Sequence, residues 1–220
     1  MQESQGDASV LEELFKKYSI DVNAYDSSGL TLLHHAAMLG YDDSIYVLFQ
    51  YGANLNQLTV TNKSVAAVAS EAGFENTAQF VSTLCEENNA FLTAIQNRDL
   101  EYIKAHDKCP DCKFYRTANG LFPLHYACNL AAYEIVNELL SVGFDPNQPD
   151  SFGRTPLHWA ALLLDWDLFS TLISHGSDLQ ARSLTGKTPV CLCYHFLKDT
   201  PSSDFSSLCD AVSPVSPFHG

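Results

Sequence analysis

The sequence predicts an all-α solenoid of helix-turn-helix repeats, some of them degenerate, linked by hairpin-like finger loops. The first observation is a motif that recurs as Gly120-Leu-Phe-Pro-Leu-His-Tyr-Ala-Cys128 and Gly153-Arg-Thr-Pro-Leu-His-Trp-Ala-Ala161. With Gly186, the leading glycines set a period of 33 residues. The second is a motif later in each unit, Gly143-Phe-Asp-Pro-Asn147 and Gly176-Ser-Asp-Leu-Gln180. A fixed period of this length is typical of stacked repeats, none of which buries its apolar face alone.

The residues of one unit indicate where its helices begin and end. Thr155 can cap the first helix, and Pro156 suits the first helical position, where its missing N–H is no loss. Leu157 and Ala160 lie at helical spacing and should be buried between neighbouring repeats. Gly176 fits the position just past the second helix, where a left-handed backbone suits glycine. An extended finger loop should then lead to the next helix pair.

The Thr-Pro-Leu-His start, the Gly-Ala-Asp-Val-Asn-like end and the period of 33 together resemble the ankyrin-repeat family, over about residues 8–198. An earlier copy, Gly29-Leu-Thr-Leu-Leu-His-His-Ala-Ala37, keeps the motif except for Leu32, where the later copies have proline. The resemblance implies an ankyrin-repeat solenoid that exposes its finger tips and inner helices on a concave face. Members of this family use variable positions there to bind other proteins.

The repeat frame weakens in the middle of the chain. Gly73 matches Gly40 one period earlier, but the next unit is about eight residues short, so the finger near Glu86 to Asn89 should be absent or reduced to a tight turn. The predicted segments are residues 1–25 (an incomplete first repeat or N-terminal capping helix), 26–58 (a repeat), 59–87 (a degenerate repeat with a shortened finger), 88–116 (a degenerate repeat), 117–149 and 150–182 (two repeats), 183–212 (a C-terminal half repeat and cap) and 213–220 (a flexible Ser/Pro tail).

The two ends of the stack are predicted to be incomplete repeats. Ser9 to Tyr18 reads as a second helix whose first helix is missing, and Pro189 to Leu197 reads as a first helix. Solenoids need caps with a polar outer face. A short helix at Phe205 to Val212 is therefore expected to cover the last repeat.

Composition narrows the classes of partner and compartment. The formal charge of −14 would repel phosphate backbones, so we expect no nucleic-acid partner. No apolar run reaches about 18 residues, and the start of the chain is polar, so neither membrane insertion nor a secretory signal is expected. The 7 cysteines, an odd number at irregular spacing, favour reduced thiols in a cytoplasmic or nuclear protein.

Basic residues concentrate in one stretch of this acidic chain. The stretch runs from Arg98 to Arg116 and also contains Lys104, Lys108 and Lys113. It is a candidate docking patch for an acidic partner, and a solvated face is the alternative interpretation.

Histidines recur in one slot of the repeat, at His34, His125 and His158. The family resemblance implies that this histidine bonds the backbone between neighbouring repeats, a structural role. No nucleophile elbow, phosphate-binding loop or kinase signature occurs, so the sequence predicts neither an enzyme nor a bound cofactor.

The sharpest chemical motif is Cys109-Pro110-Asp111-Cys112. A Cys-x-x-Cys pair is half of a zinc site, but no second pair exists in the chain. We interpret the motif as a tight turn with two exposed thiols. Two alternatives stay open, namely a metal site formed by Cys109, Cys112, His106 and one further ligand, and a regulatory disulfide.

The positions that flank each signature motif are apolar for a face that is normally wet. The predicted partner-binding residues on the concave face are Leu30, Met38, Leu39, Leu121, Asn129, Leu130, Phe152, Arg154, Leu162 and Leu163. Repeats in register would align them into a stripe that suits an amphipathic helix or an extended peptide. The alternative is that the fingers cover these leucines, or that they are merely scattered.

These observations favour a monomeric adaptor, scaffold or regulator that binds another protein. The alternative is an ankyrin domain that recruits substrates for a larger enzyme, or that belongs to a host-directed effector protein. Because one fold serves many unrelated partners, the repeats alone do not identify the partner.

Overall fold

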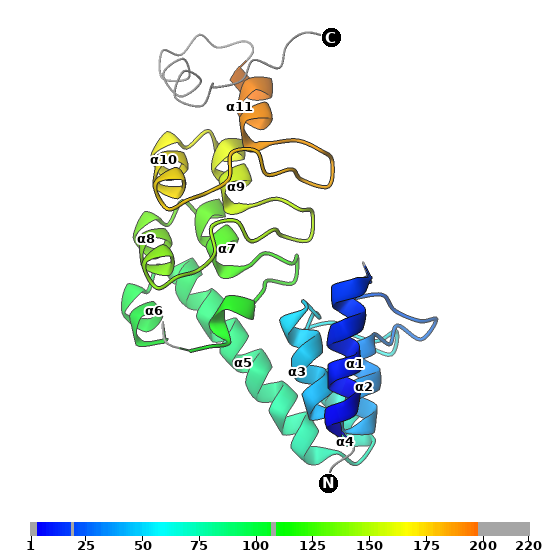
Figure 1. The fold of residues 1–220 in the computed structure, drawn as a ribbon. Helices are drawn as coiled ribbons and strands as arrows, with labels where there is room; N and C mark the ends of the chain where they lie inside the picture. The colour runs from blue at the N-terminus through cyan, green and yellow to red at the C-terminus, as the bar shows by residue number, and fades with distance from the viewer. Residues whose placement is uncertain (1–3, 19, 107–108, 198–220) are drawn as a thin grey trace. The chain divides into compact units, whose positions relative to one another are not determined.

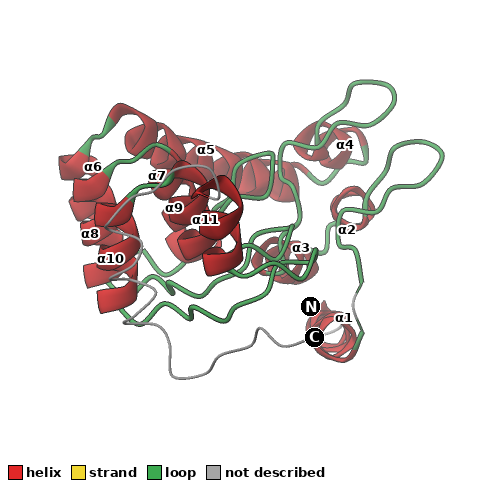
Figure 2. Cartoon of the chain, turned by 90° about the horizontal axis from the view of Figure 1, so that it is seen from above, coloured by secondary structure: helices red, strands yellow, loops and turns green. Residues whose placement is uncertain are grey.

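The computed structural model describes residues 4–18, 20–106 and 109–197, and it confirms the all-α repeat fold (Figure 1). The chain divides into two compact units, Met1–Tyr126 (unit 1) and Ala127–Gly220 (unit 2). The helices are α1 (Ser4–Lys17), α2 (Leu32–Leu39), α3 (Asp42–Gln50), α4 (Val65–Glu71), α5 (Glu75–Asn97), α6 (Leu100–His106), the 3-10 helix η1 (Cys112–Phe114), α7 (Pro123–Asn129), α8 (Tyr133–Ser141), α9 (Pro156–Leu163), α10 (Trp166–Ser174) and α11 (Pro189–Leu197). Figure 2 shows helices joined by loops in these residues, and their β-structure consists of two isolated bridges in finger loops of unit 1.

In unit 1, like helices pack on like helices. The first helices α2 and α4 contact each other, and the second helix α3 contacts both α1 and α5. Leu33, Ile45 and Leu48 are almost fully buried, as expected of the apolar stripe of an amphipathic helix. The rings of Phe15 and Tyr51 stack with centroids 4.9 Å apart and fix α1 beside the end of α3. The predicted second helix at the start of the chain therefore occupies the second-helix layer.

Helix α5 replaces the missing finger. The finger is absent, which is one of the two expected outcomes, and the tight turn expected as the alternative near Glu86 to Asn89 does not form, because α5 continues through these residues as one helix of 23 residues, about 35 Å long. The physical reason is local. Glycine and proline are absent between Glu75 and Asn97, so no residue breaks the helix. The helix ends at Arg98, which adopts a left-handed backbone with φ of 56°.

A short segment, residues 111–116, ties α5 to α3, and we call it the strap. The ring of Tyr115 lies 6.1 Å from that of Phe49 and 5.5 Å from that of Phe91. The buried side chain of Asn88 accepts the Arg116 N–H at 2.7 Å and donates to the Arg116 carbonyl at 3.1 Å. Both polar groups of this amide are thus satisfied, as a buried side chain requires.

Unit 2 has the regular two-column arrangement. Figure 1 shows α9 and α11 in one column and α8 and α10 in the other. Leu157, Ala160 and Leu168 are fully buried, which confirms the predicted positions of Leu157 and Ala160 in the core. The last helix has the predicted bounds, Pro189–Leu197. The predicted cap at 205–212 and the Ser/Pro tail at 213–220 lie outside the described residues.

Candidate functional site

Each finger loop is closed by the same set of contacts. In the finger at Asp150, the backbone N–H of this residue donates to the Arg154 carbonyl, and its carboxylate accepts the Arg154 N–H, both at 2.8 Å. Gly153, with φ of 70°, donates its N–H to the Asp150 carbonyl at 2.9 Å. The base residues are Asp26, Thr59, Thr117, Asp150 and Ser183, and their partners four positions later are Leu30, Lys63, Leu121, Arg154 and Lys187.

Neighbouring fingers within a unit touch through their backbones. The Val60 N–H donates to the Ser28 carbonyl at 3.1 Å in unit 1, and the Leu184 N–H donates to the Phe152 carbonyl at 2.9 Å in unit 2. A Cβ on Gly153 would lie 2.9 Å from the Leu184 nitrogen, so only glycine allows this approach. The two fingers of each of these pairs are therefore held in register, and equivalent side chains project from equivalent positions.

The repeated histidine holds the start of the first helix and the next finger. Nδ1 of His158 accepts the Thr155 N–H at 3.0 Å, so Nε2 carries the proton and donates to the Lys187 carbonyl at 3.0 Å. Nδ1 of His34 accepts the Thr31 N–H at 3.2 Å. Burial lowers the pKa of both imidazoles and favours their neutral form. His158 thus has the structural role that the resemblance implied.

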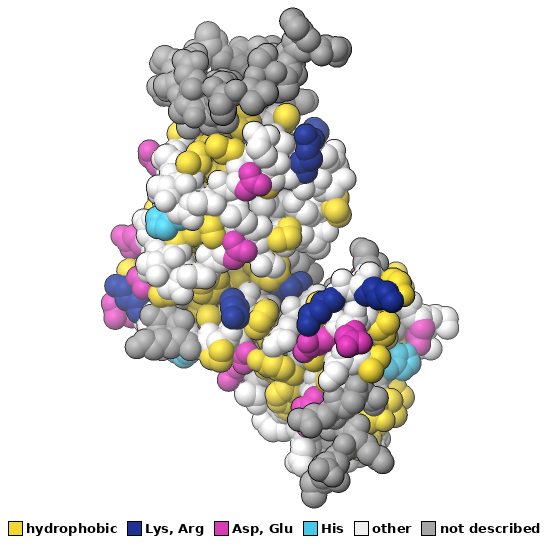
Figure 3. Space-filling view, in the orientation of Figure 1, with side chains coloured by type: hydrophobic (Ala, Val, Ile, Leu, Met, Phe, Trp, Pro, Cys, Tyr) yellow, Lys and Arg dark blue, Asp and Glu magenta, His cyan; other side chains and the backbone are white. Residues whose placement is uncertain are grey.

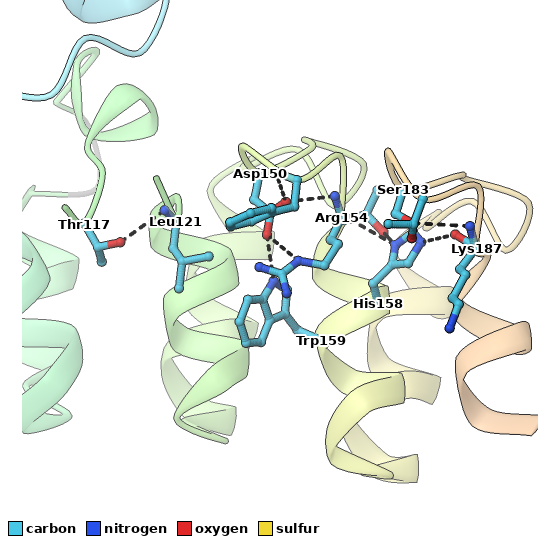
Figure 4. A network of polar contacts seen from close by, with 11 residues as sticks. Thr117, Leu121, Asp150, Arg154, His158, Trp159, Ser183 and Lys187 are labelled. Atoms are coloured by element: carbon cyan, nitrogen blue, oxygen red, sulfur yellow. Dashed lines mark hydrogen bonds and ion pairs between the residues drawn. The ribbon is translucent and has the colours of Figure 1, made fainter. Parts of the chain in front are cut away.

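Phe152, Arg154 and Trp159 form a stacked cluster on unit 2, which we call the Phe-Arg-Trp cluster. The Arg154 guanidinium lies 4.7 Å from the centroid of the Phe152 ring and 4.3 Å from that of the Trp159 ring. Asp150 orients the cluster (Figure 4), because its carboxylate accepts Arg154 Nε–H at 2.9 Å and Trp159 Nε1–H at 3.2 Å. Phe152 is 57% exposed. Arginine and large aromatic residues are the types most often found where binding energy concentrates at interfaces.

Four further predicted binding residues of unit 2 are exposed or half-buried. Leu163, the last residue of α9, is 44% exposed. Leu162 beside it is half-buried, and so are Asn129 and Leu130. A position that is half-buried can still contribute to a binding surface, but its substitution also disturbs the fold. Leu163 and Phe152 are therefore the better probes of binding in this unit.

The predicted residues of unit 1 divide between surface and core. Met38 and Leu39 are exposed at the end of α2, and Leu30 is half-buried. The assignment of Leu121 to the binding surface is wrong, because this side chain is only 7% exposed. Leu121 shares its finger position with Arg154, whose charged end must stay near water or a carboxylate, whereas a leucine at the same position is stabilised by burial.

The basic stretch does not form one exposed patch among its described members. Arg116 is half-buried in the strap, where its guanidinium lies 4.0 Å from the centroid of the Phe122 ring and donates to the Gln50 carbonyl at 3.5 Å. Burial lowers the pKa of Arg116 to about 10. Arg98, Lys104 and Lys113 are exposed. Arg116 therefore stabilises unit 1 and is not available to a partner.

The Cys-Pro-Asp-Cys motif forms a tight turn, as expected, but its two thiols are not both exposed. Cys112 is only 3% exposed, and its Sγ–H donates to the Cys109 carbonyl at 2.9 Å. Burial raises the pKa of Cys112 to about 11. The imidazole of His106 stacks on the ring of Tyr102 in α6 instead of turning toward the cysteines. In the described part of the chain, no group of three or more metal-ligating side chains comes together.

Sequence reasoning missed two features of the surface. Trp159 completes the Phe-Arg-Trp cluster, and its signal was its place directly after the repeated histidine on an otherwise apolar helix. Leu184 is 79% exposed at a finger tip and lies against Gly153 of the finger before it. Its signal was a large apolar residue within a loop of small and polar residues.

The described helices include none with the length and apolar character needed to span a bilayer.

Comparisons with known proteins agree with the repeat geometry. Two family models match, ankyrin repeats in three copies over residues 71–183 and a single ankyrin repeat over residues 28–60. The chain is 33% identical over 101 residues to a Fowlpox virus (strain NVSL) protein named as ankyrin repeat protein FPV244, an alignment that covers 44% of this chain and 15% of that protein. It is 25% identical over 154 residues to a protein of Acanthamoeba polyphaga mimivirus named as ankyrin repeat protein L371, with 64% and 20% covered. The chain spans a fifth or less of the length of these curated relatives. The two model matches, together with the finger and helix geometry, show that the chain belongs to the ankyrin-repeat family.

Proposed function

We propose that this chain is a non-catalytic binding module, an adaptor, scaffold or regulator, that holds a partner protein against its finger loops and first helices. Ankyrin repeats generally mediate protein–protein interaction, which supports this class of function. The observation that carries the proposal is the Phe-Arg-Trp cluster of unit 2. Phe152 is exposed and Trp159 is half-buried, and the support beneath them is rigid, since Asp150 fixes both Arg154 and Trp159.

The apolar surface around the cluster supports the same proposal. Phe152, Leu163 and Leu184 are large apolar side chains exposed on the fingers and first helix of unit 2. Scattered exposed leucines need no explanation. Here, however, the finger backbones are bonded in register, so that Phe152 and Leu184 come from neighbouring finger tips. In unit 1, Met38 and Leu39 offer a smaller apolar surface.

The proposed partner is a protein, bound by a monomer in the cytoplasm or nucleus. The formal charge of −14 argues against a nucleic-acid partner. The cysteines in the described part of the chain are free of disulfides, in keeping with a reducing compartment.

The proposal is tested by affinity capture on the folded chain. Phe152→Glu and Leu163→Glu place a charge on the proposed surface, and Ser170→Glu adds the same charge to an exposed position of α10 as a matched control. Partners bound by the wild type should be lost with the first two variants and retained with the third, while circular dichroism shows equal helicity for all. If both surface variants retain every partner, the binding site lies outside the proposed surface.

A second candidate function is recruitment within a longer protein. Both relatives are viral proteins of which the alignments cover 15% and 20%. If the same holds for this chain, the repeats could select the substrate of a catalytic segment or the target of a host-directed effector. Catalytic motifs elsewhere in the full open reading frame would favour this function, and their absence would favour the adaptor.

A further inference from the structure

Charge is segregated in the described part of unit 2. Its basic residues, Arg154, Arg182 and Lys187, all lie in the finger loops. Its acidic residues, except Asp150, lie on the second helices or in the turns beside them, and they are Glu134, Glu138, Asp145, Asp165, Asp167 and Asp178. Figure 3 shows the dark blue atoms of this unit on the finger side and its magenta atoms at the α8 and α10 edge and in the middle of the view. An acidic chain thus presents a face of the opposite sign.

The carboxylate of Asp150 is not accessible to a partner. Its side chain is fully buried. Its carboxylate already accepts four N–H groups, from the backbone of Phe152 and Arg154 and from the side chains of Arg154 and Trp159. An approaching partner therefore meets the cations of the fingers and not this carboxylate.

Arg182 and Lys187 are the accessible cations of this face. Both are exposed, and in the described part of unit 2 neither forms an ion pair. The Arg182 guanidinium donates to the Gly186 carbonyl at 3.1 Å, which holds it along the finger. Lys187 takes the same position in its finger as Arg154 in the finger before it.

The apolar part of the face comes from the same two finger loops and from α9. Phe152 and Trp159 sandwich the Arg154 guanidinium, and Leu184 projects from the next finger tip. A ligand that only carried negative charge would leave these apolar surfaces in water. A ligand that combines carboxylates with an aromatic or aliphatic side chain would use both parts of the face.

We propose that the finger face of unit 2 binds an acidic segment of a partner protein, in which Asp or Glu side chains flank an aromatic or aliphatic residue. This inference rests on the proposed function and specifies the chemistry of its partner. The carboxylates contact Arg182 and Lys187, and the apolar side chain packs on Phe152, Trp159 and Leu184. Complementary charge on a finger face also speeds association and makes it sensitive to salt.

The test selects a phage-displayed library of random peptides on the full chain. Peptides enriched by the wild type should be acidic and carry Phe, Trp or Leu. Synthetic copies should bind the double variant Arg182→Glu/Lys187→Glu at least about tenfold more weakly. The matched control, Lys16→Glu/Lys17→Glu, makes the same change in charge on α1 of unit 1 and should leave their affinity unchanged. Raising NaCl from about 50 to about 500 mM should weaken wild-type binding and have little effect on the double variant.

The outcomes separate the partner chemistry from the proposed function. Enriched peptides that are neutral or basic, yet are lost with Phe152→Glu, would overturn the acidic partner and retain the binding face. Acidic peptides that bind the Arg182→Glu/Lys187→Glu variant as tightly as the wild type would also overturn it. If the library yields no enriched peptide, or yields only peptides whose affinity Phe152→Glu leaves unchanged, the acidic-segment proposal is wrong. Affinity capture with the same variant then decides whether the proposed function survives.

Discussion

The pH dependence of stability tests the assignment of His158 as a neutral imidazole with two hydrogen bonds. Burial lowers its pKa in the folded chain, so the unfolded chain binds more protons at mildly acidic pH. Stability contributed by the neutral form is therefore present above the unfolded pKa, about 6.5, and is lost as the pH falls below it. If the folded imidazole stays neutral, unit 2 should lose up to about 1.2 kcal/mol between pH 7 and pH 5.5.

The variant His158→Leu separates this titration from simple loss of contacts. At pH 7 it should destabilise the unit by about 2 to 3 kcal/mol, because the Thr155 N–H loses its buried acceptor and the Lys187 carbonyl loses a donor. It should also remove most of the pH dependence. Urea unfolding followed by the fluorescence of Trp159 and Trp166 reports on unit 2, which contains both tryptophans. The exposed His175→Leu is the control.

An unfolding free energy of the wild type that does not change over this range would refute the assignment. So would an unchanged pH dependence in His158→Leu, since another group would then be responsible.

Three further predictions concern the core, the fingers and the thiols. In urea titrations, Leu157→Ala should lower the free energy of unfolding by about 2 to 5 kcal/mol, because Leu157 is fully buried. Leu163→Ala should lower it by about 0.5 kcal/mol or less, because Leu163 is exposed, and equal losses would place Leu163 in the core. Gly153→Ala should lower the free energy of unfolding by at least about 1 kcal/mol more than Gly186→Ala, because both glycines have positive φ but only Gly153 has the next finger against it. Equal melting temperatures of the two variants would contradict this close approach. At pH 7 the thiol of Cys112, with its pKa raised to about 11, should react with a maleimide more slowly than the thiol of Cys109. Elemental analysis of the purified chain should find no stoichiometric zinc, and about one zinc per chain would establish the metal site.

The helices that carry the signature motif could be predicted closely from the sequence. Thr155 and Pro156 mark the start of α9 through local chemistry, a cap and a fixed φ, which needs no knowledge of the rest of the chain. The bounds of α11 follow from the same signal. The finger position with positive φ could be predicted from local chemistry as well, since glycine occupies it in most fingers. Asn62 occupies it in one finger, with φ of 61°. Asparagine is among the few residues that adopt this conformation readily.

The features that the sequence did not reveal depend on long-range contacts. The shortened repeat near Glu86 to Asn89 indicated that the finger is absent or a tight turn, but it did not indicate that one helix continues across the junction, although no helix breaker is present there. The strap satisfies the buried amide of Asn88 through Arg116, a contact 28 residues away in sequence that no local pattern encodes. Leu121 was assigned to the surface by analogy with Arg154. A repeat frame fixes the backbone position, whereas the residue type decides whether the side chain is buried.

The continuous helix α5 has a consequence for the evolution of binding specificity. Two pairs of fingers stay in register because the later finger donates a backbone hydrogen bond to the one before it, as Val60 does to Ser28 and Leu184 does to Phe152. No finger is formed by the described residues between the loop at 59–63 and the loop at 117–121. The backbone contacts that align fingers are thus interrupted, and substitutions in the fingers on one side need not preserve the alignment on the other. The charges agree with such independence, because the finger at Asp26 carries a carboxylate and the finger at Thr59 carries Lys63, while the finger at Ser183 in unit 2 presents the accessible cations Arg182 and Lys187.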